Sequence, residues 1–438
     1  MQKVELNKYD NYKDSKVEWL GEIPEEWEIT RVKNVFKLII KPAPKNNDLE
    51  LLSVYTDIGV KPRRELEERG NKASTTDGYW MVKKGDIIVN KLLAWMGAIG
   101  VSKYDGVTSP AYDILRAKVK IESDFYHYLF RNKGCLSELK KHSRGIMDMR
   151  LRLYFDKFGD VVIPFPKYEI QQRIVKFLDE KCGKIDQAIA QKQKLIEILK
   201  ERKQILIQNA VTKGLDPNVK MKDSGVEWIG EIPVDWEVKK LKYFINVQGG
   251  FAFDSSDFVE EGVQIIKIAN TYMNQLCLDR QPTFVHESYL DSHKQWIVKN
   301  GDILMSLTGT LGKKDYGFAI LIEGDNKYLL NQRVAKITIK NELQTKYLLT
   351  LLRSDCYLNQ LYSLPAGTKQ ANLSNDNVTN VRVPIPSLKE REQIFIYIET
   401  QSTKIDKAIT LQQQQIEKLK EYKASLINSA VMGKIKVC

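Results

Sequence analysis

Two long stretches of the chain place apolar residues at intervals that alternate between four and three. The first stretch runs from Ile185 to Ala210 and the second from Ile405 to Ala430, and neither contains Gly or Pro. This 3.5-residue repeat is typical of helices that pack together as a coiled coil. We therefore predict two long helices, whose packing residues are Ile185, Ile189, Ile196, Leu199, Leu206, Ile405, Ile409, Ile416, Leu419 and Leu426.

Polar residues interrupt the two stripes at matching places, Lys192 and Lys203 in the first, Gln412 and Lys423 in the second. Polar residues at such positions often fix the register of paired helices at some cost in stability. One alternative is that each helix only covers the core of its own domain. The matched stripes favour packing of the two helices on each other, antiparallel, as a rod of roughly 60 Å at 1.5 Å per residue.

The regions before these helices carry short β-like runs with a few helical pieces between them. They extend over about residues 29–162 and 238–383, and a P-x-P motif follows each one. Short apolar and β-branched runs that are bounded by turn residues predict strands. Each region is therefore predicted to be one α+β domain.

The chain is an internal duplication. Residues 13–28 and 222–237 share 12 identities in 16 positions, and residues 164–211 and 384–431 share 19 in 48, both without a gap. A repeat of this length indicates two copies of one structural unit.

The predicted fold is α+β, with two α/β domains separated by two long antiparallel coiled-coil helices and related by a pseudo-twofold repeat. The predicted segments are 1–163 for the lead-in and first domain, 164–213 for the first helix, 214–222 for a linker, 223–383 for the second lead-in and domain, and 384–438 for the second helix.

Each duplicated lead-in contains two tryptophans, and both domains contain a GDI motif followed by GxxG. The context of the tryptophans is repeated while the domains differ, so we predict packing anchors at Trp19, Trp27, Trp228 and Trp236. Elsewhere the two domains share little sequence. This combination predicts two similar frames that carry different surfaces.

Basic residues exceed acidic ones, which gives a net charge of +12 and a pI near 9.1. Such a balance favours a polyanionic partner, because Lys and Arg bind phosphates with release of counterions. The chain has no apolar run long enough to cross a bilayer, and its start lacks the apolar core of a signal peptide. We expect no membrane association and a cytoplasmic location.

Motifs for catalysis and for metal binding are missing from the sequence. The five cysteines are scattered without a CxxC pair and the four histidines lack a metal-binding spacing, so neither a disulfide framework nor a zinc site is predicted. GxGxxG and GxSxG motifs are absent, and the stretch 309–314 fails the Walker pattern at two positions. We predict no catalytic residue, metal or cofactor in this chain, and an active site of an unrecognised type is the alternative.

Flexible turns in both domains carry side chains suited to reading DNA. Arg and Lys pair with guanine edges, and Asn and Gln pair with adenine edges. The candidates are Arg63, Arg64, Lys91, Tyr112, Arg144, Arg150 and Arg152 in the first domain, and Thr308, Thr310, Lys313, Asn331, Gln332, Arg333, Thr368, Lys369, Gln370 and Asn372 in the second. Glycine-rich turns also use Asn and Thr for conformational reasons, and Trp95, a candidate for base stacking, fits a core position better.

Taken together, these motifs resemble the specificity subunits of type I restriction–modification systems. The resemblance covers nearly the whole chain. It rests on DSGVEWIGEIPVDWE (223–237), GDIL followed by GTLG, AGTKQANLS (366–374), and PIPSLKEREQI running into the helix with KID at 404–406. The first domain departs from this pattern, because GIMDMRLRL (145–153) stands where the second has AGTKQANLS.

The resemblance implies two target-recognition domains, each reading one half of a bipartite, asymmetric sequence in double-stranded DNA. It implies that the helices set the spacer and dock two modification methyltransferase subunits, which methylate adenine with S-adenosylmethionine. Separate motor–nuclease restriction subunits, with ATP and Mg, would translocate and cut the DNA. The chain itself would be a non-catalytic specificity subunit.

Two other functions stay open at this point. A self-sufficient DNA methyltransferase or nuclease with an unrecognised active site would act without partners. A two-headed protein-interaction scaffold would show no salt-dependent affinity for DNA, and the basic charge balance argues against it.

Overall fold

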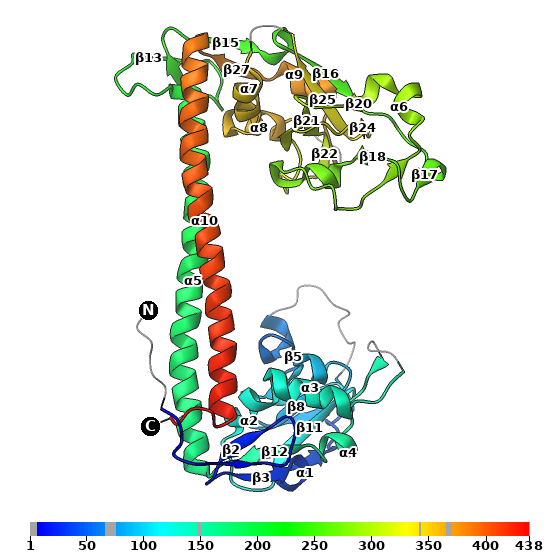
Figure 1. The fold of residues 1–438 in the computed structure, drawn as a ribbon, viewed down its shortest axis with the longest axis vertical. Coiled ribbons are helices and arrows are strands. Elements are labelled where there is room, and N and C mark those ends of the chain that lie inside the picture. The colour runs from blue at the N-terminus through cyan, green and yellow to red at the C-terminus, as the bar shows by residue number, and fades with distance from the viewer. Residues whose placement is uncertain (1–6, 66–75, 147–149, 341–342, 365–369, 438) are drawn as a thin grey trace. The chain divides into compact units, whose positions relative to one another are not determined.

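The computed structural model describes residues 7–65, 76–146, 150–340, 343–364 and 370–437. The chain divides into two compact units, of which unit 1 consists of Met1–Gln193 with Gln413–Cys438 and unit 2 of Lys194–Gln412. The boundary falls inside the two longest helices, α5 (Tyr168–Lys213) and α10 (Leu388–Val431). Each unit therefore contains part of both helices (Figure 1).

Unit 1 is built on an antiparallel sheet with the strand order β4–β11–β8–β9. These strands are β4 (Phe36–Ile39), β11 (Tyr112–Ala117), β8 (Ile87–Asn90) and β9 (Ile99–Val101). Two-stranded ladders surround the sheet: β1 (Tyr12–Asp14) with β2 (Glu22–Pro24), β3 (Glu28–Arg31) with β12 (Val162–Phe165), β5 (Leu52–Tyr55) with β6 (Gly59–Pro62), and β7 (Trp80–Val82) with β10 (Gly106–Thr108). Its short helices are α1 (Val32–Val35), α2 (Ser123–Phe130), α3 (Lys133–His142) and α4 (Phe155–Phe158).

The core of unit 1 gathers around α2. This helix buries Phe125, Tyr126, Leu129 and Phe130 completely, at the spacing of one helical face. Burying a large apolar side chain contributes about 1.5–3 kcal/mol. Ile174 of α5 joins the same hydrophobic cluster, so the first turns of that long helix cover the domain that precedes it.

Unit 2 repeats this frame with the sheet order β16–β25–β21–β23. These strands are β16 (Ile245–Gly249), β25 (Val334–Ile339), β21 (Ile303–Ser306) and β23 (Ala319–Leu321). The elements that match those of unit 1 are β13 (Met221–Asp223) with β14 (Glu231–Pro233), β15 (Glu237–Lys240) with β27 (Arg382–Ile385), and the helices α7 (Thr345–Leu352), α8 (Asp355–Tyr362) and α9 (Asn375–Asn380).

Unit 2 differs from unit 1 in a five-stranded sheet, where unit 1 has the shorter ladders β5–β6 and β7–β10. The strands of this sheet, in spatial order, are β17 (Phe258–Val259), β19 (Phe284–Val285), β18 (Val263–Ile266), β24 (Tyr328–Leu330) and β20 (Ile297–Val298). Helix α6 (Tyr289–Ser292) lies between β19 and β20 in the sequence. The frames agree and the additions differ, as the duplicated sequence predicts.

The GDI motif forms the same turn in both units. Gly85 and Gly301 have φ values of 91° and 89°, a left-handed conformation that favours glycine. The carboxylates of Asp86 and Asp302 accept the N–H of the residue three positions earlier at 2.8 and 2.9 Å. The motif therefore fixes the entry into the central strands β8 and β21.

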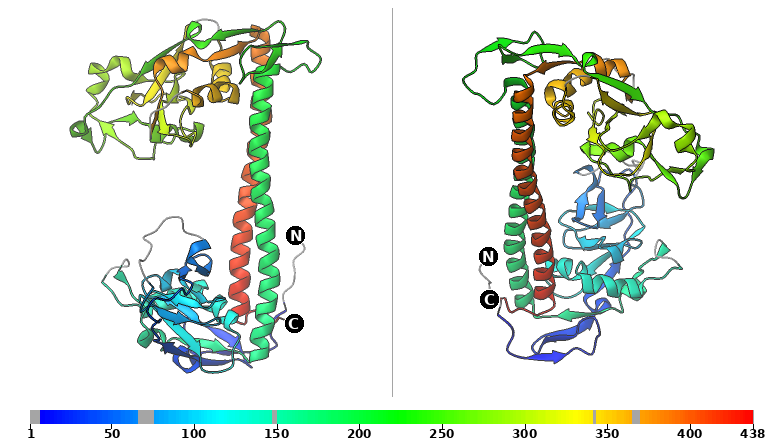
Figure 2. Two further views of the ribbon diagram at one scale, coloured as in Figure 1. Left: turned by 180° about the vertical axis from the view of Figure 1, so that it is seen from behind. Right: turned by 45° about the horizontal axis from the view of Figure 1, so that its top comes forward.

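In unit 1 the first half of α5 packs against the second half of α10, so the helices run in opposite directions. Ile185 lies in one hydrophobic cluster with Leu419 and Leu426. Lys423 Nζ lies 2.7 Å from both carboxylate oxygens of Asp186, and the views in Figure 2 show the two helices side by side. The predicted antiparallel pairing is confirmed, and the alternative, in which each helix covers only its own domain, is wrong.

Unit 2 repeats this pairing with the helix halves exchanged. Lys203 Nζ lies 2.8 and 2.7 Å from the carboxylate oxygens of Asp406. The two aspartates belong to the repeated KID motif, and the two lysines are polar positions of the predicted stripe. Exposed ion pairs contribute about 0–1 kcal/mol. These two pairs therefore help to set the register of the helices and add little to the stability. Of the predicted packing residues, Ile189, Leu199 and Leu206 are half-buried, and the buried ones are Ile185, Ile196, Ile405, Ile409, Ile416, Leu419 and Leu426.

The duplicated lead-ins hold the ends of the two long helices. Two residues after the end of α10, Gly433 has a φ of 68°, and an added Cβ there would lie 3.2 Å from the Trp27 ring. After α5, Gly214 has a φ of 76°, and its added Cβ would lie 3.3 Å from Trp236. Both tryptophans are fully buried. Each lead-in thus seats a helix end, which explains why the chain contains it twice.

The packing prediction is confirmed for Trp27 and Trp236, and Trp19 is half-buried against the core of unit 1. For Trp228 the prediction is wrong, because 39% of its surface is exposed. Trp228 lies in the turn between β13 and β14 and is not part of the hydrophobic cluster of unit 2, whereas Trp19, in the equivalent turn between β1 and β2, packs on the cluster of unit 1.

We predict that Gly433→Ala destabilises the protein by about 2 kcal/mol or more. A left-handed alanine costs roughly 1–2 kcal/mol, and its Cβ would lie 2.4 Å from Pro24 Cδ. Gly183→Ala is the matched control, since Gly183 lies inside α5 with no atom within 4 Å of an added Cβ. That change should stabilise the protein by up to about 1 kcal/mol. Urea unfolding measures the change in the free energy of unfolding for both variants. Equal changes of the same sign would contradict the close packing of Gly433 against Pro24 and Trp27.

His127 gives unit 1 a pH-dependent stability. Its ring packs against Gly59 and Gly100, where added Cβ atoms would lie 2.9 and 3.0 Å from ring atoms. Burial, aided by the charge of Arg131, lowers the pKa of His127 to about 4. The unfolded chain takes up this proton near pH 6.5. The contribution of His127 to the free energy of unfolding is therefore fully present above that pH and is lost as the pH falls toward 4.

We predict that His127→Leu flattens this slope, which amounts to at most about 3 kcal/mol. Leu349 occupies the equivalent position of α7, so leucine suits the frame. Thermal unfolding of both proteins between pH 6.5 and pH 4, the window set by this pKa shift, measures the slope. An unchanged slope in the variant would assign the pH dependence to other groups.

Candidate nucleic-acid interface

A two-stranded ribbon in unit 2 brings together predicted residues that are distant in the sequence. Strand β22 (Thr308–Thr310) pairs with β26 (Gln370–Asn372), with Thr308 opposite Asn372 and Thr310 opposite Gln370. The Thr308 hydroxyl donates to Asn372 Oδ1 at 3.0 Å, and Arg333 Nη1 donates to the same oxygen at 3.4 Å. Asn372 is exposed, so these bonds orient an amide that a ligand can reach.

The turn at 331–333 lies against the glycine-rich segment after β16. Phe251 donates its N–H to the Leu330 carbonyl at 2.8 Å and accepts the Gln332 N–H at 2.9 Å. A Cβ on Gly250 would lie 2.1 Å from the Asn331 oxygen, so this close approach requires glycine. Because Leu307 N–H bonds the Arg333 carbonyl at 3.0 Å, the turn and the ribbon form one surface that holds Asn331, Gln332 and Arg333.

A surface pocket of about 430 Å³ opens beside this ribbon. Asp315 Oδ1 accepts the Thr310 N–H at 2.5 Å, which fixes the pocket's acidic wall. Tyr272 also lines the pocket, with its ring 5.7 Å from that of Phe318 and 4.4 Å from the Arg280 guanidinium. The lining residues are Ile268, Ala269, Tyr272, Thr308, Gly309, Thr310, Asp315 and Gln370.

Sequence reasoning missed Tyr272 and Arg280. Both lie in or after the irregular 3-10 segment η6 (Ile268–Asn274), where Met273 and Asn274 have positive φ values. Such a segment has no hydrophobic period, so no sequence signal marks its side chains. Lys313 is exposed in the loop after β22. Of the predicted candidates in unit 2, those outside the described residues are Thr368 and Lys369.

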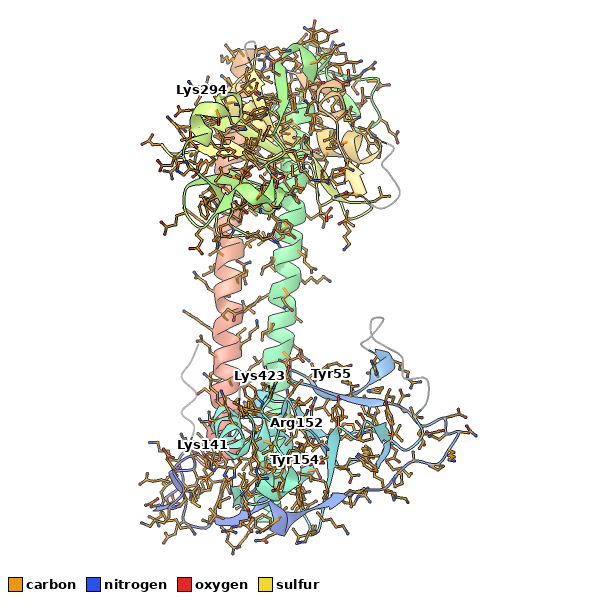
Figure 3. All side chains as sticks on the ribbon, turned by 90° about the vertical axis from the view of Figure 1, so that its right-hand side faces the viewer. Tyr55, Lys141, Arg152, Tyr154, Lys294 and Lys423 are labelled. Carbon is orange, nitrogen blue, oxygen red and sulfur yellow. The ribbon has the colours of Figure 1, made fainter. Side chains whose placement is uncertain are left out.

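A cationic cluster forms in unit 1 from Lys91, Arg144 and Arg152. Arg144 and Arg152 exchange two backbone hydrogen bonds of 2.9 Å, and Leu153 N–H bonds the Lys91 carbonyl at 2.8 Å. Arg150 belongs to the same segment, since its carbonyl oxygen would lie 2.5 Å from a Cβ on Gly145. Figure 3 labels Arg152 on this part of unit 1.

The cations of this cluster differ in their availability. Lys91 Nζ lies 3.4 Å from Asp113, and burial raises the pKa of Asp113 while Lys91 opposes that rise. Arg144 pairs with Asp156 at 3.1 Å. Among the described residues, Arg152 has no carboxylate in ion-pair range. In the described part of the chain, Arg152 and the neighbouring Arg150, both exposed, are therefore more free than Lys91 or Arg144 to meet a phosphate or a base.

Of the remaining candidates of unit 1, Arg63 and Arg64 lie on a different element, whereas Tyr112 pairs with Asn90, the residue before Lys91. Arg63 and Arg64 form the 3-10 turn η1 (Arg63–Glu65) after β6, and Arg64 pairs with Glu50 at 3.1 Å. Tyr112 is half-buried and packs on the small core beneath β5 and β6. Trp95 is half-buried as well, packed against the core of unit 1, with its Nε1 donating to a backbone carbonyl at 3.1 Å.

Exposed apolar side chains accompany these cations, and sequence reasoning did not select them. Leu92, Leu93 and Met96 lie on the loop between β8 and β9, and Leu311 lies on the equivalent loop between β21 and β23. Apolar side chains contact the methyl group of thymine in many DNA complexes. Their exposure depends on the tertiary structure and is not visible in the sequence.

Two further findings concern the described part of the chain only. Within it, no three side chains of His, Cys, Asp or Glu gather closely enough to hold a metal ion. Helices long and apolar enough to span a membrane are also absent from the residues that the structure describes. Cys135 and Cys356 are buried, and this burial raises the pKa of both thiols, which disfavours a reactive thiolate.

Comparison with known proteins finds one family twice along the chain. The model of the type I restriction modification DNA specificity domain matches residues 24–200 and again residues 233–421. The type I restriction enzyme MjaVIII specificity subunit of Methanocaldococcus jannaschii is 29% identical over 426 residues, which cover 95% of this chain and 94% of that protein. The EcoBI specificity subunit of Escherichia coli is 23% identical over 355 residues, 76% of this chain and 71% of that protein.

Solved structures share the fold. A chain from a structure of the type I R-M system, determined to explain complex assembly and conformational transition, has a TM-score of 0.71 at 15% identity, covering 94% of this chain and 99% of that one. The HsdS subunit from Thermoanaerobacter tengcongensis has a TM-score of 0.50 at 15% identity, covering 94% and 98%.

Proposed function

The chain belongs to the type I restriction modification DNA specificity family, and we propose that each of its two domains reads one half of a bipartite DNA site. The observation that carries the proposal is the double match of the family to two units with the same central sheet and different additions. Two different readers on one chain suit an asymmetric sequence, which a symmetric homodimer does not.

The candidate surfaces supply both kinds of contact that DNA recognition needs. Cations such as Arg152 and Lys313 suit phosphates, which provide affinity and orientation without sequence information. The oriented Asn372 amide and the neighbouring Arg333 suit base edges, where bidentate pairs with adenine and guanine discriminate by about 1–3 kcal/mol. Unit 2 would therefore read its half-site with the ribbon β22–β26 and the turn at 331–333.

The long helices would set the spacer between the half-sites. Both α5 and α10 continue without interruption from one unit into the other, and a helix has a fixed rise of 1.5 Å per residue. Two modification methyltransferase subunits would dock on this chain, and restriction subunits would join them. S-adenosylmethionine, ATP and Mg would be bound by those partners, and the chain itself would be non-catalytic.

We predict that the complex of this chain with its methyltransferase subunits prefers one bipartite sequence with one gap length. Adding or removing a base pair in the gap rotates one half-site about the DNA axis by roughly a tenth of a turn, so the preference should be lost. Competition gel shifts with a library of gap lengths measure it. Equal binding to every gap would contradict a helix-set spacer, and methyl transfer by the purified chain alone would favour the self-sufficient enzyme.

We predict that Arg333→Ala and Asn372→Ala each weaken recognition of one half-site about 5- to 150-fold, the equivalent of 1–3 kcal/mol. The other half-site and the salt-dependent binding of unrelated DNA should change little. Lys239→Ala on β15, on the lead-in side of unit 2, is the matched control. Loss of both half-sites, or equal loss in the control, would contradict a base-reading role.

A further inference from the structure

Two half-buried arginines occupy equivalent places in the two units. Arg131 follows α2 directly and Arg353 follows α7 directly, and each is the C-terminal cap of its helix. The helices α3 and α8 begin two residues later in each unit. The repeat therefore retains an arginine at this position in domains whose sequences otherwise share little.

In unit 1 the Arg131 guanidinium binds the backbone carbonyls of two separate loops. It donates to Gly97 at 2.7 Å and Ile99 at 3.2 Å, both at the end of the loop between β8 and β9. It also donates to Tyr55 at 3.3 Å and Thr56 at 2.8 Å, in the turn between β5 and β6. One side chain thus ties the loop that carries Lys91, Leu92 and Met96 to the turn of an adjacent hairpin.

In unit 2 the Arg353 guanidinium makes the corresponding connection. It donates to the Ala319 carbonyl at 2.9 Å, where the loop between β21 and β23 ends. Its second acceptor is the Asn274 carbonyl at 3.1 Å, at the end of η6, and Asn274 Oδ1 accepts the Ala319 N–H at 2.8 Å. One of the segments it joins carries Thr310 and the other carries Tyr272, and both residues line the surface pocket.

The acceptors in the two units are equivalent by strand register. Ile99 pairs with Val89 in the ladder β8–β9, and Ala319 pairs with Met305 in the ladder β21–β23. Each is the first residue of its edge strand. The second acceptors differ, because the hairpin of unit 1 and the η6 segment of unit 2 belong to the parts in which the units diverge.

These arginines are held by carbonyls and not by carboxylates. Within the described residues neither guanidinium forms an ion pair. Burial lowers the pKa of both groups, to about 10 for Arg353, while Asp57 opposes the shift at Arg131. A guanidinium presents five N–H donors in a rigid fork, so it can hold two loops at once.

We propose that Arg131 and Arg353 are positioning residues that hold the DNA-reading loops of their units through backbone carbonyls. The inference rests on the proposed function and identifies the side chains that position the DNA-reading loops. Every residue has a carbonyl, so the side chains on a held loop can change without loss of the clamp. Different base-reading surfaces are therefore compatible with one frame.

The test uses the full chain with its methyltransferase subunits and the bipartite sequence that the gap library selects. Arg353→Lys keeps the charge but loses the fork, so discrimination at the half-site of unit 2 should fall about tenfold or more, as expected for lost charge-assisted hydrogen bonds. The half-site of unit 1 and the binding of unrelated DNA should stay unchanged. Arg131→Lys should give the mirror-image result, and Arg382→Lys, an exposed arginine on β27, is the matched control.

Hydrogen exchange separates a lost clamp from a lost fold. In Arg353→Lys, exchange should quicken at 268–274 and 307–318 while α7 and the central strands of unit 2 keep their protection. Unchanged discrimination, or equal loss at both half-sites, would overturn the proposal, as would uniform loss of protection across unit 2. If the unmodified complex shows no sequence preference, the proposed function fails, and the exchange pattern still tests the clamp.

Discussion

The antiparallel pairing of α5 with α10 is the constraint on which the rest of the structure depends. Because the helices run in opposite directions, the end of each lies beside the start of the other, and each unit is completed by a helix half from the other copy of the repeat. The lead-in tryptophans, the KID aspartates and the glycines after the helices all serve this exchange. These segments are the ones in which the two copies keep the same sequence.

The helices and the repeat could be predicted from the sequence because their signals are local. A heptad stripe is a property of consecutive residues, and a duplication is visible by direct comparison. The roles of Asp186 and Asp406 could not be predicted, since their lysine partners are 237 and 203 residues away and are set by the antiparallel register. The prediction that Trp228 packs in the core was also wrong, because a repeated sequence does not guarantee a repeated depth of burial.

For the candidate site, the sequence indicates suitable side chains but not which of them meet. Thr308 and Asn372 were both predicted, and a two-stranded ladder across 64 residues of sequence joins them. Arg64 of unit 1 was predicted by the same reasoning, but it lies in the turn after β6, on a different element from Arg144 and Arg152, and pairs with Glu50. Arg131 and Arg353 were invisible, because their acceptors are backbone carbonyls, which every residue has. The uneven outcome reflects the difference between side-chain chemistry, which is written in the sequence, and loop placement, which is not.

The exchange of helix ends has a consequence for biosynthesis. Met432, Ile435 and Val437 lie in the same hydrophobic cluster as Tyr9 and Trp27, although the ribosome makes them some four hundred residues later. Until then the nascent N-terminal domain leaves aromatic surface in water, and such surface recruits chaperones or aggregates. A polypeptide released before residue 432 therefore lacks the residues that complete the cluster around Tyr9 and Trp27.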